Sequence, residues 1–178
     1  MPQLLDPNFR RAVILLVHHD DEGTFGLVVN RSADIPTSDL CTTLGIEWRG
    51  DRGSLVGVGG PVQPNTGWLL FADKDFTEGS DQQTDTGVTE VCENFFCAGS
   101  LDALRSVAGS AAQRARLFLG YAGWGAGQLE QELAQGAWLI APASPEIVFD
   151  VSPEAMWEYV LRRLGVDPAT LVATPGIH

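Results

Sequence analysis

The sequence predicts a single α+β domain built from several short strands and a few helices. At 178 residues, the chain is long enough for one well-buried core and short for two. Its apolar residues come in short runs, and 20 glycines and 10 prolines help to separate those runs. Such runs favour short strands over the long amphipathic helices of a bundle. No repeat or linker interrupts the sequence, so we expect one domain across residues 1–178.

The expected centre of this domain is the stretch of residues 117–142. Residues 117–119 and 137–140 are continuously apolar, which predicts two central, buried strands. Four glycines in residues 120–127 predict a sharp turn after the first of these strands. Residues 128–135 are good helix formers and a glycine follows them, which predicts a short helix between the turn and the second strand.

The N-terminal third predicts a β-hairpin over residues 11–31. Residues 12–17 form its first strand, residues 18–23 its turn and residues 24–29 its second strand. The turn contains the sequence His-His-Asp-Asp, and imidazoles and carboxylates are common metal ligands. Adjacent strand residues point to opposite faces and cannot easily converge on one ion, so we expect a solvated hairpin end and no metal site.

Capping and bend signals predict the next elements. Residues 37–44 predict a short helix, with Thr37 at its N-cap and a glycine at its end. Residues 55–58 predict a strand that runs into a bend at Gly59-Gly60-Pro61, where a side chain would block close approach. Residues 68–71 predict the strand that follows.

The remaining elements lie on either side of the central stretch. Residues 73–85 are acidic and lack an apolar period, which predicts a surface loop. Residues 87–97 predict a strand or a strand pair, and Ser100 is expected to cap a helix that ends near residue 108. Ser152-Pro153 is a typical helix start, and an apolar stripe at helical spacing continues to residue 164.

Composition argues against nucleic-acid and membrane partners. The formal net charge is −12, with ten arginines and one lysine among 23 acids, whereas backbone binding to DNA or RNA normally requires a basic face. Five arginines are plausible contributors to such a face, and they fall on separate predicted elements: Arg105, Arg114, Arg116, Arg162 and Arg163. The longest apolar run, residues 12–17, is far below the roughly 20 residues that cross a bilayer. Without a signal-peptide pattern, the sequence predicts a cytoplasmic protein.

No familiar cofactor or nucleophile motif is present. Gly123 and Gly125 match the first two positions of the dinucleotide-binding motif GxGxxG, but Gln128 occupies the third. The serines lie outside any GxSxG elbow, and three cysteines without a CxxC pair predict buried apolar fillers. We therefore expect no cofactor and no metal, although an enzyme that uses two of the many carboxylates stays an alternative.

Several segments together resemble the bacterial AlgH/YqgE family. They are DPNF at residues 6–9, GLVVNR at 26–31, GGPV at 59–62, GYAGWGAGQLEQEL at 120–133 and AWL at 137–139. The match covers about residues 1–164 and leaves a short tail at 165–178. The resemblance implies a fold of coiled, branching mixed β-sheets with helices around them. It brings no catalytic residue, and family members are often labelled transcriptional regulators through an association with alginate control.

The sequence departs from the family pattern at two places. Where family members commonly have a Leu-His pair after GGPV, this chain has Leu70-Phe71. The polar loop around residues 78–86 has no clear counterpart.

The motif segments also supply a candidate ligand site. Strand ends and helix starts that converge make clefts with a few polar groups and aromatic walls. The candidate ligand-binding residues are Asn30, Arg31, Gly59, Gly60, Pro61, Tyr121, Trp124 and Gln128. The competing interpretation is that Asn30 and Gln128 satisfy backbone groups and that Arg31 pairs with an acid.

From these residues we predict a regulatory module that binds a small ligand or a protein partner without turnover. Arg31 is the one strong anion donor in the candidate set, which favours an anionic ligand. Two alternatives remain open at this point, a regulator that acts directly on DNA and the enzyme with an unrecognised carboxylate site.

Overall fold

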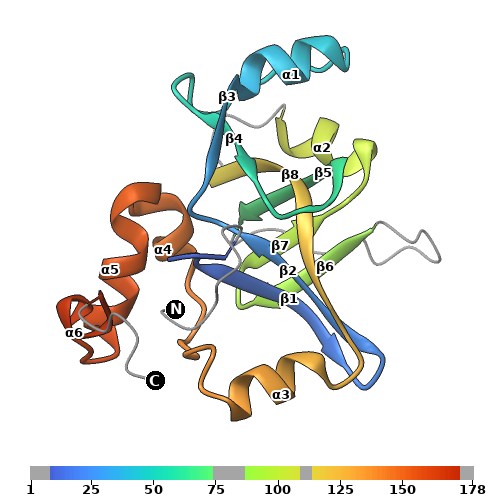
Figure 1. Ribbon diagram of the computed structural model, residues 1–178. Helices are drawn as coiled ribbons and strands as arrows, with labels where there is room; N and C mark the ends of the chain where they lie inside the picture. The colour runs from blue at the N-terminus through green and yellow to red at the C-terminus, as the bar shows by residue number, and fades with distance from the viewer. Residues whose placement is uncertain (1–8, 74–86, 109–113, 173–178) are drawn as a thin grey trace.

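The computed structural model describes residues 9–73, 87–108 and 114–172 and has the α+β fold that the sequence predicts (Figure 1). The strands are β1 (Ile14–Asp20), β2 (Gly23–Val28), β3 (Ser32–Pro36), β4 (Leu55–Val58), β5 (Val62–Ala72), β6 (Val88–Cys92), β7 (Phe95–Ala98) and β8 (Arg114–Gly125). The helices are α1 (Thr37–Thr43), α2 (Leu101–Ala108), α3 (Gln128–Ala134), α4 (Pro145–Asp150), α5 (Pro153–Arg163) and α6 (Pro168–Val172). The predicted acidic loop at residues 73–85 lies almost entirely outside the described residues.

The strands form one mixed, branched sheet. The main path runs β1-β2-β8-β5-β7-β6, and β6 comes back into contact with β1, so the sheet is nearly closed. The branch consists of β3 and β4, which pair with each other and join the main path through a parallel pairing of β4 with β8. All the other neighbours on the path are antiparallel. This branched, coiled arrangement is the one that the family resemblance implies.

The central strand of the sheet is β8, which pairs with β2, β4 and β5. Leu117 and Phe118 are buried, as predicted, with 3% and 0% of their surfaces exposed. The prediction of a glycine-rich turn directly after residue 119 is wrong, because the strand continues to Gly125 and pairs residues 122–125 with β2. Glycine is required within the strand at Gly120, which has φ of +75° and packs against the backbone of Gly60.

The second predicted central strand, residues 137–140, does not exist. These residues continue from α3 as an irregular segment, and Leu139 and Ile140 are 48% and 70% exposed. An apolar run between a glycine and a proline fits a buried strand and an irregular segment over an apolar surface equally well, because only the partner across the chain distinguishes them. Residues 137–140 form an irregular segment over an apolar surface, since residues 138–140 line a cleft beside the sheet.

Alternate residues of the central strands enter two different cores, because successive side chains point to opposite faces. One core contains Leu70, Phe95, Cys97 and Phe118 and is covered by residues of α4 and α5. The other contains Leu69, Phe71, Phe96 and Leu117 and is covered by residues of α1 and α2. Phe71, at the position where the family resemblance led us to expect a histidine, is fully buried and stacks on Phe96, with ring centroids 5.3 Å apart.

Most of the other predicted elements are present in the structure, and three observed elements were not predicted. The helices α1, α2, α3 and α5 and the strand pair β6–β7 lie where they were predicted, and Ser100 Oγ accepts the amide of Ala103 as a cap (3.1 Å). The prediction of Thr37 as the N-cap of α1 is wrong, because Pro36 takes that position and Thr37 is the first residue of the helix. Strand β3, helix α4 and helix α6 were not predicted. The β1–β2 turn is only two residues long, so His18, His19 and Asp20 lie in β1 and not in the turn. In the described part of the chain, no helix is long and apolar enough to span a bilayer.

Candidate functional site

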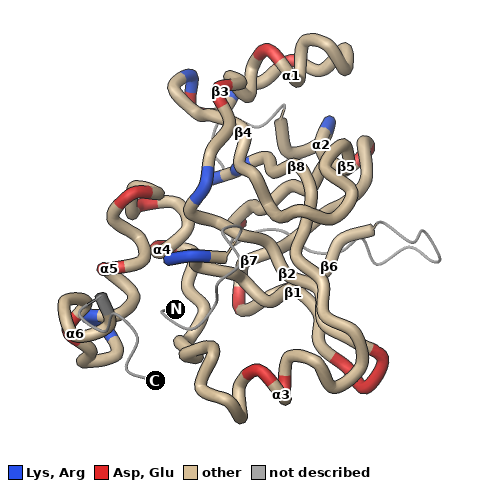
Figure 2. The backbone as a smooth tube through the Cα atoms, in the orientation of Figure 1, with Lys and Arg blue, Asp and Glu red and all other residues tan. Residues whose placement is uncertain are grey.

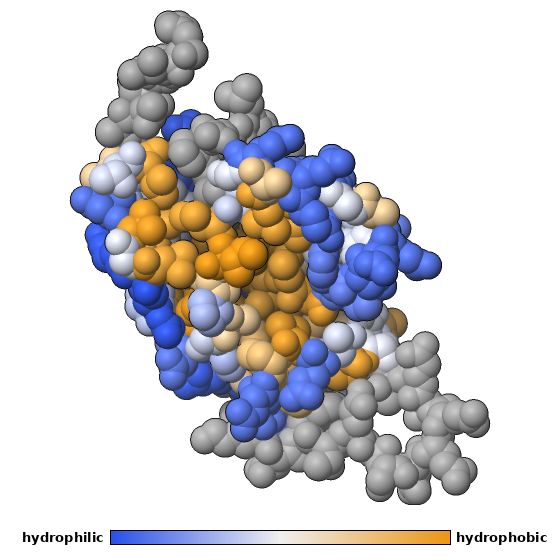
Figure 3. Space-filling model, turned by 90° about the horizontal axis from the view of Figure 1, so that it is seen from below, coloured by the Kyte–Doolittle hydropathy of each residue, from blue (hydrophilic) through white to orange (hydrophobic). Residues whose placement is uncertain are grey.

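An apolar cleft of about 230 Å³ lies beside the start of β1. Figure 3 views the molecule from the side of α3 and shows a continuous hydrophobic face in a hollow there, with a hydrophilic border. Four parts of the chain line the cleft: the strand β1 with the residues before it, helix α3, residues 138–144, and helices α4 and α5. The aromatic and larger aliphatic side chains among the lining residues are Val13, Ile14, Leu15, Leu16, Val29, Trp124, Leu129, Leu133, Trp138, Leu139, Ile140, Ile147, Val148, Trp157, Val160, Leu161 and Leu164. We call this feature the apolar cleft.

The cleft exists because β1 is apolar on both of its faces. Leu15 points into the core that α4 and α5 cover, whereas Ile14 packs with the small cluster of Trp124 and Leu129 on the opposite side. Helix α3 and the irregular segment after it cover that opposite side only in part. Leu16 and Leu139 stay 40% and 48% exposed at the cleft.

Two tryptophan walls of the cleft are held by one carboxylate. Glu132 Oε2 accepts the indole N–H of Trp124 at 3.0 Å and that of Trp138 at 2.7 Å. Glu132 Oε1 accepts Gln128 Nε2 at 3.2 Å, one helical turn earlier. Hydrogen bonds to a charged acceptor are stronger than neutral ones, so this network fixes the orientation of both indole rings. Phe9 packs on both rings, with centroids 6.3 Å from Trp124 and 5.9 Å from Trp138.

The chemistry that the cleft offers is almost purely apolar. No Asp, Glu, His, Cys, Lys or Arg side chain occurs among the described residues that line it. The only hydroxyl in the lining is that of Ser144, which accepts the amide of Glu146 as the cap of α4 (3.3 Å). A cleft of this composition can desolvate an apolar group, but it supplies neither an acid–base pair nor a nucleophile to a reaction.

Of the eight residues predicted to bind a ligand, only Trp124 lines the apolar cleft. Asn30 ties the residues before β1 to the end of β2, because its Oδ1 accepts the amide of Val13 (2.9 Å) and its Nδ2 donates to the carbonyl of Arg11 (2.8 Å). Gln128 Oε1 accepts the amide of Gly125 (3.1 Å) at the turn into α3. Both side chains thus have the backbone-satisfying roles of the competing interpretation.

The glycines of the candidate set lie where two backbones meet. The carbonyl of Gly59 accepts the amide of Val28 at 2.7 Å, and its amide donates to the carbonyl of Leu119 at 2.8 Å. A Cβ at Gly60 would collide with the backbone of Tyr121. Glycine is therefore needed here for close approach between strands, as the sequence predicted.

Pro61, Tyr121 and Arg31 surround this junction without lining the cleft. Pro61 is exposed at the bend after β4. Tyr121 packs in an aromatic cluster with Phe25, with ring centroids 5.0 Å apart. The carbonyl of Arg31 accepts the amide of Val58 (2.9 Å), and its Nη2 donates to the carbonyl of Arg10 (2.9 Å).

A second, wider pocket of about 610 Å³ is polar and lies between the β3–β4 branch, the start of β8 and the junction of α4 and α5. Asp150 forms an ion pair with Arg114 there (3.2 Å). Arg116 Nη1 donates to the carbonyls of Val29 (3.0 Å) and Val148 (3.3 Å), and burial lowers the pKa of this guanidinium. These contacts join β8 to the end of β2 and to α4, so Arg116 has a clear structural role.

The described residues contain one hydroxyl–imidazole–carboxylate chain, at the end of the β1–β2 hairpin. His19 Nδ1 lies 2.6 Å from Thr24 Oγ1, and His19 Nε2 lies 3.2 Å from Glu130 Oε1. A nucleophile must be reachable by its substrate, and Thr24 is only 6% exposed. The role of these three hydrogen-bonded side chains is therefore structural, because they connect the hairpin to α3. No group of three or more metal-ligating side chains was found within the described ranges.

The cysteines are free and have no sign of activation. Cys41 and Cys97 are buried, as predicted, while Cys92 is half-buried. Burial raises the pKa of Cys41, and it raises the pKa of Cys97 to about 12. Burial and the nearby Glu90 and Glu93 raise the pKa of Cys92. A nucleophilic cysteine needs a lowered pKa, so these thiols fit a packing role.

The family model for AlgH-like proteins matches residues 1–169. The chain belongs to the AlgH-like family. Among its relatives is a UPF0301 protein of Myxococcus xanthus, which is 41% identical over 100% of this chain and 94% of the relative. A UPF0301 protein of Magnetococcus marinus is 37% identical over 97% of this chain and 89% of the relative.

Two solved structures have a similar fold. The solution structure of the AlgH protein from Pseudomonas aeruginosa aligns with a TM-score of 0.73 and 34% identity, over 100% of this chain and 92% of that one. A crystal structure of a protein from Corynebacterium diphtheriae aligns with a TM-score of 0.68 over 96% of this chain and 84% of that one, and its 24% identity supports the fold alone. The AlgH-like fold is thus shown, and the family assigns no reaction to it.

The apolar cleft is the feature of this AlgH-like protein that sequence reasoning missed. Its walls come from segments that lie up to 150 residues apart in the chain, and none of them carries a recognisable motif for a ligand. Two signals were present in the sequence. The continuous apolar run of β1 implied that both of its faces are covered, and residues 137–141 are apolar without interruption.

Proposed function

We propose that the protein is a binding module that takes an apolar group into the apolar cleft and does not turn it over. The observation that carries this proposal is an open cavity of about 230 Å³ with 22 described lining residues, none of them ionisable. Pockets for drug-sized ligands span roughly 300–1,000 Å³, so the cleft suits a short aliphatic chain or a few apolar side chains of a partner. A regulatory role would follow if the bound group reports on metabolism or on a partner protein.

Direct action on DNA has less support than this binding role. Three of the five arginines that could contribute to a basic face have acidic neighbours: Arg105 lies 3.7 Å from Asp102, Arg114 3.2 Å from Asp150, and Arg162 3.2 Å from Glu158. Figure 2 shows the basic positions spread over separate elements. We therefore expect no duplex binding at physiological salt. Fluorescence anisotropy that shows salt-sensitive binding to a DNA duplex would contradict this expectation.

The binding role is tested with linear alcohols from butanol to decanol, titrated by calorimetry. Each methylene that enters an apolar site contributes about 0.8 kcal/mol, which corresponds to roughly a fourfold gain in affinity. We expect affinity to rise with chain length and to stop rising when the cleft is full. An absence of binding across the whole series would overturn the proposal.

Nuclear magnetic resonance of the indole N–H groups locates the bound alcohol. Trp124, Trp138 and Trp157 line the cleft, whereas Trp48 and Trp68 do not, so the chain contains its own control. We expect the first three signals to shift during the titration and the other two to stay in place. Shifts confined to Trp48 or Trp68 would place the ligand elsewhere and contradict the proposal.

A matched pair of variants on α3 completes the test. Leu133→Trp adds volume to the cleft wall, and Ala134→Trp adds the same side chain at an exposed position outside the lining. We expect Leu133→Trp to weaken the binding of octanol at least tenfold and Ala134→Trp to leave it unchanged. Equal affinities of the two variants would argue against the cleft as the site.

A further inference from the structure

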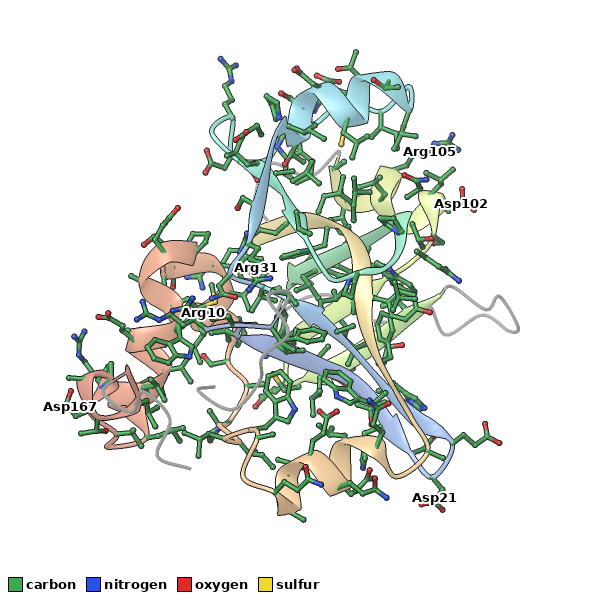
Figure 4. The ribbon with its side chains drawn as sticks, in the orientation of Figure 1. Arg10, Asp21, Arg31, Asp102, Arg105 and Asp167 are labelled. Atoms are coloured by element: carbon green, nitrogen blue, oxygen red, sulfur yellow. The ribbon has the colours of Figure 1, made fainter. Side chains whose placement is uncertain are left out.

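Three arginines lie near one end of the apolar cleft without lining it. The Arg11 guanidinium lies over the ring of Trp157, 5.1 Å from its centroid, and Trp157 lines the cleft. The cleft lining begins with the next residue, Ala12. Arg31 Nη2 donates to the carbonyl of Arg10 (2.9 Å), and Figure 4 shows Arg10 and Arg31 side by side where the chain enters β1. We call Arg10, Arg11 and Arg31 the arginine cluster.

The cluster is a local exception in an acidic protein. The net charge of the chain is −12. Arg10 and Arg11 are exposed, and within the described ranges neither forms an ion pair. On the neighbouring helix α5, Glu158 is paired with Arg162 at 3.2 Å. The positive charge of Arg10 and Arg11 therefore lies next to Trp157, at the end of the cleft that faces α5.

The opposite end of the cleft is acidic. Helix α3 carries Glu130, which lies 3.2 Å from His19, and Glu132, which holds the two indoles. Figure 2 shows acidic positions on α3 and, well separated from them, basic positions where the chain enters β1. The charges around the apolar lining thus have a direction, from the arginine cluster at one end to the two glutamates of α3 at the other.

We infer that the occupant of the apolar cleft is a monomeric fatty-acyl carboxylate, with its chain in the cleft and its carboxylate at the arginine cluster. This inference rests on the proposed function and names its ligand class. The guanidinium fork matches the geometry of a carboxylate, and the apolar lining matches an alkyl chain. The direction of the charges sets the direction of the ligand, because a carboxylate at the α3 end would face Glu130 and Glu132.

Charge also favours a monomeric ligand over two other occupants. An anionic bilayer presents many negative charges to the whole face of the molecule, and a chain with net charge −12 is repelled by such a surface. A second copy of the chain carries the same net charge, which opposes self-association. A single carboxylate meets only the cluster.

The test compares three ligands of equal chain length: octanoate, 1-octanol and octyltrimethylammonium, each titrated below its aggregation concentration. Exposed ion pairs contribute modestly, so we expect octanoate to bind roughly three- to tenfold more tightly than octanol in 50 mM salt. The octyl cation should bind more weakly than octanol. The preference for octanoate should shrink in 500 mM salt, because salt screens exposed charges.

A charge-matched pair of variants assigns the preference to the cluster. The double variant Arg10→Gln/Arg11→Gln should lose the preference for octanoate and keep the affinity for octanol. The control is Arg49→Gln/Arg52→Gln, which removes the same charge from the distant loop after α1 and should keep both affinities. Retention of the octanol affinity in the double variant also shows that the cleft is still folded.

Several outcomes would overturn the inference. If the unchanged protein bound octanoate and octanol with equal affinity, the carboxylate inference would be wrong and the proposed binding function would stand. If neither ligand bound, both the inference and the proposed function would be wrong. Sedimentation with anionic phosphatidylglycerol vesicles, without binding of octanoate, would assign the face to a membrane. A dimer that octanol and octanoate dissociate equally would assign the cleft to a second copy of the chain.

Discussion

The indole nitrogen of Trp138 donates to Glu132 Oε2 at 2.7 Å, and this hydrogen bond joins the irregular segment after α3 to the helix itself. The same oxygen accepts Trp124 from β8 at 3.0 Å. One carboxylate thus holds strand, helix and segment together around the apolar cleft. The segment pairs with no strand of the described structure, so it is positioned by this hydrogen bond, by the bond from the amide of Ala137 to the carbonyl of Glu132 (2.9 Å) and by the packing of Trp138.

Replacing Glu132 should loosen both the fold and the cleft. Glu132→Ala removes the acceptor of two partly buried indole N–H groups, and an unsatisfied buried donor costs about 1–3 kcal/mol. Glu132→Gln keeps an acceptor oxygen, so its loss of stability should be smaller. Urea denaturation measures the stability, and the titration with octanol measures the cleft.

The control for this prediction is Glu130→Ala on the same helix. Glu130 is half-exposed, and His19 is its ion-pair partner within the described residues, so its removal should cost at most about 1 kcal/mol. If Glu132→Ala were no more destabilising than Glu130→Ala, the hydrogen bonds of Glu132 to the two indoles would not contribute to stability.

Gly120 should be far less replaceable than another glycine with the same backbone conformation. Gly120 and Gly136 have φ of +75° and +71°, so alanine is strained at both. At Gly120 an added Cβ would also collide with the carbonyl of Gly60 and approach Pro64 Cα at 3.3 Å, whereas at Gly136 nothing lies within 4 Å. We expect Gly136→Ala to cost about 1 kcal/mol and Gly120→Ala at least about 2 kcal/mol more.

Thermal and urea unfolding of the two variants measure this difference. The comparison isolates the close approach of β8 to the bend after β4, because the conformational cost is shared. Similar stabilities of Gly120→Ala and Gly136→Ala would mean that the two backbones separate easily at this point.

The parts of the fold that the sequence predicted are those with local signals. Helix α5 starts at Ser152-Pro153 and ends before Gly165, whose φ is +73°, and each of these signals acts within one helical turn. The failed strand at residues 137–140 had no such signal. Its apolar residues were compatible with a sheet, but the neighbours of β8 are β2, β4 and β5, which leave no place beside it.

The candidate site, too, could be predicted only where the sequence carries a local signal. Asn30 and Gln128 were selected as polar residues near strand ends, and both hydrogen-bond to backbone groups of neighbouring segments. A polar residue near a strand end has the same sequence context whether it contacts a ligand or a backbone group, so the sequence could not distinguish the two roles. The cleft itself is formed by β1, α3 and α5, and only the three-dimensional path of the chain shows that their apolar faces meet.

The stability of the protein should fall between about pH 9 and pH 12 in a manner that depends on Cys97. Burial raises the pKa of this thiol from its ordinary value of 9.0 to about 12 in the folded state. Above pH 9 the unfolded chain has lost the thiol proton while the folded chain keeps it. The unfolded state then binds fewer protons, so stability decreases as the pH rises, by up to about 1.4 kcal/mol per pH unit.

Cys97→Ala should remove this part of the pH dependence. The variant is less stable at pH 8, because a buried side chain is shortened, but its stability should fall less than that of the unchanged protein between pH 8 and pH 10.5. Other groups that titrate in this range are common to both proteins and cancel in the comparison. Urea denaturation at the two pH values gives the difference, with Cys92→Ala as the half-buried control. Parallel losses of stability in Cys97→Ala and the unchanged protein would show that the Cys97 thiol ionises as readily in the folded state as in the unfolded one.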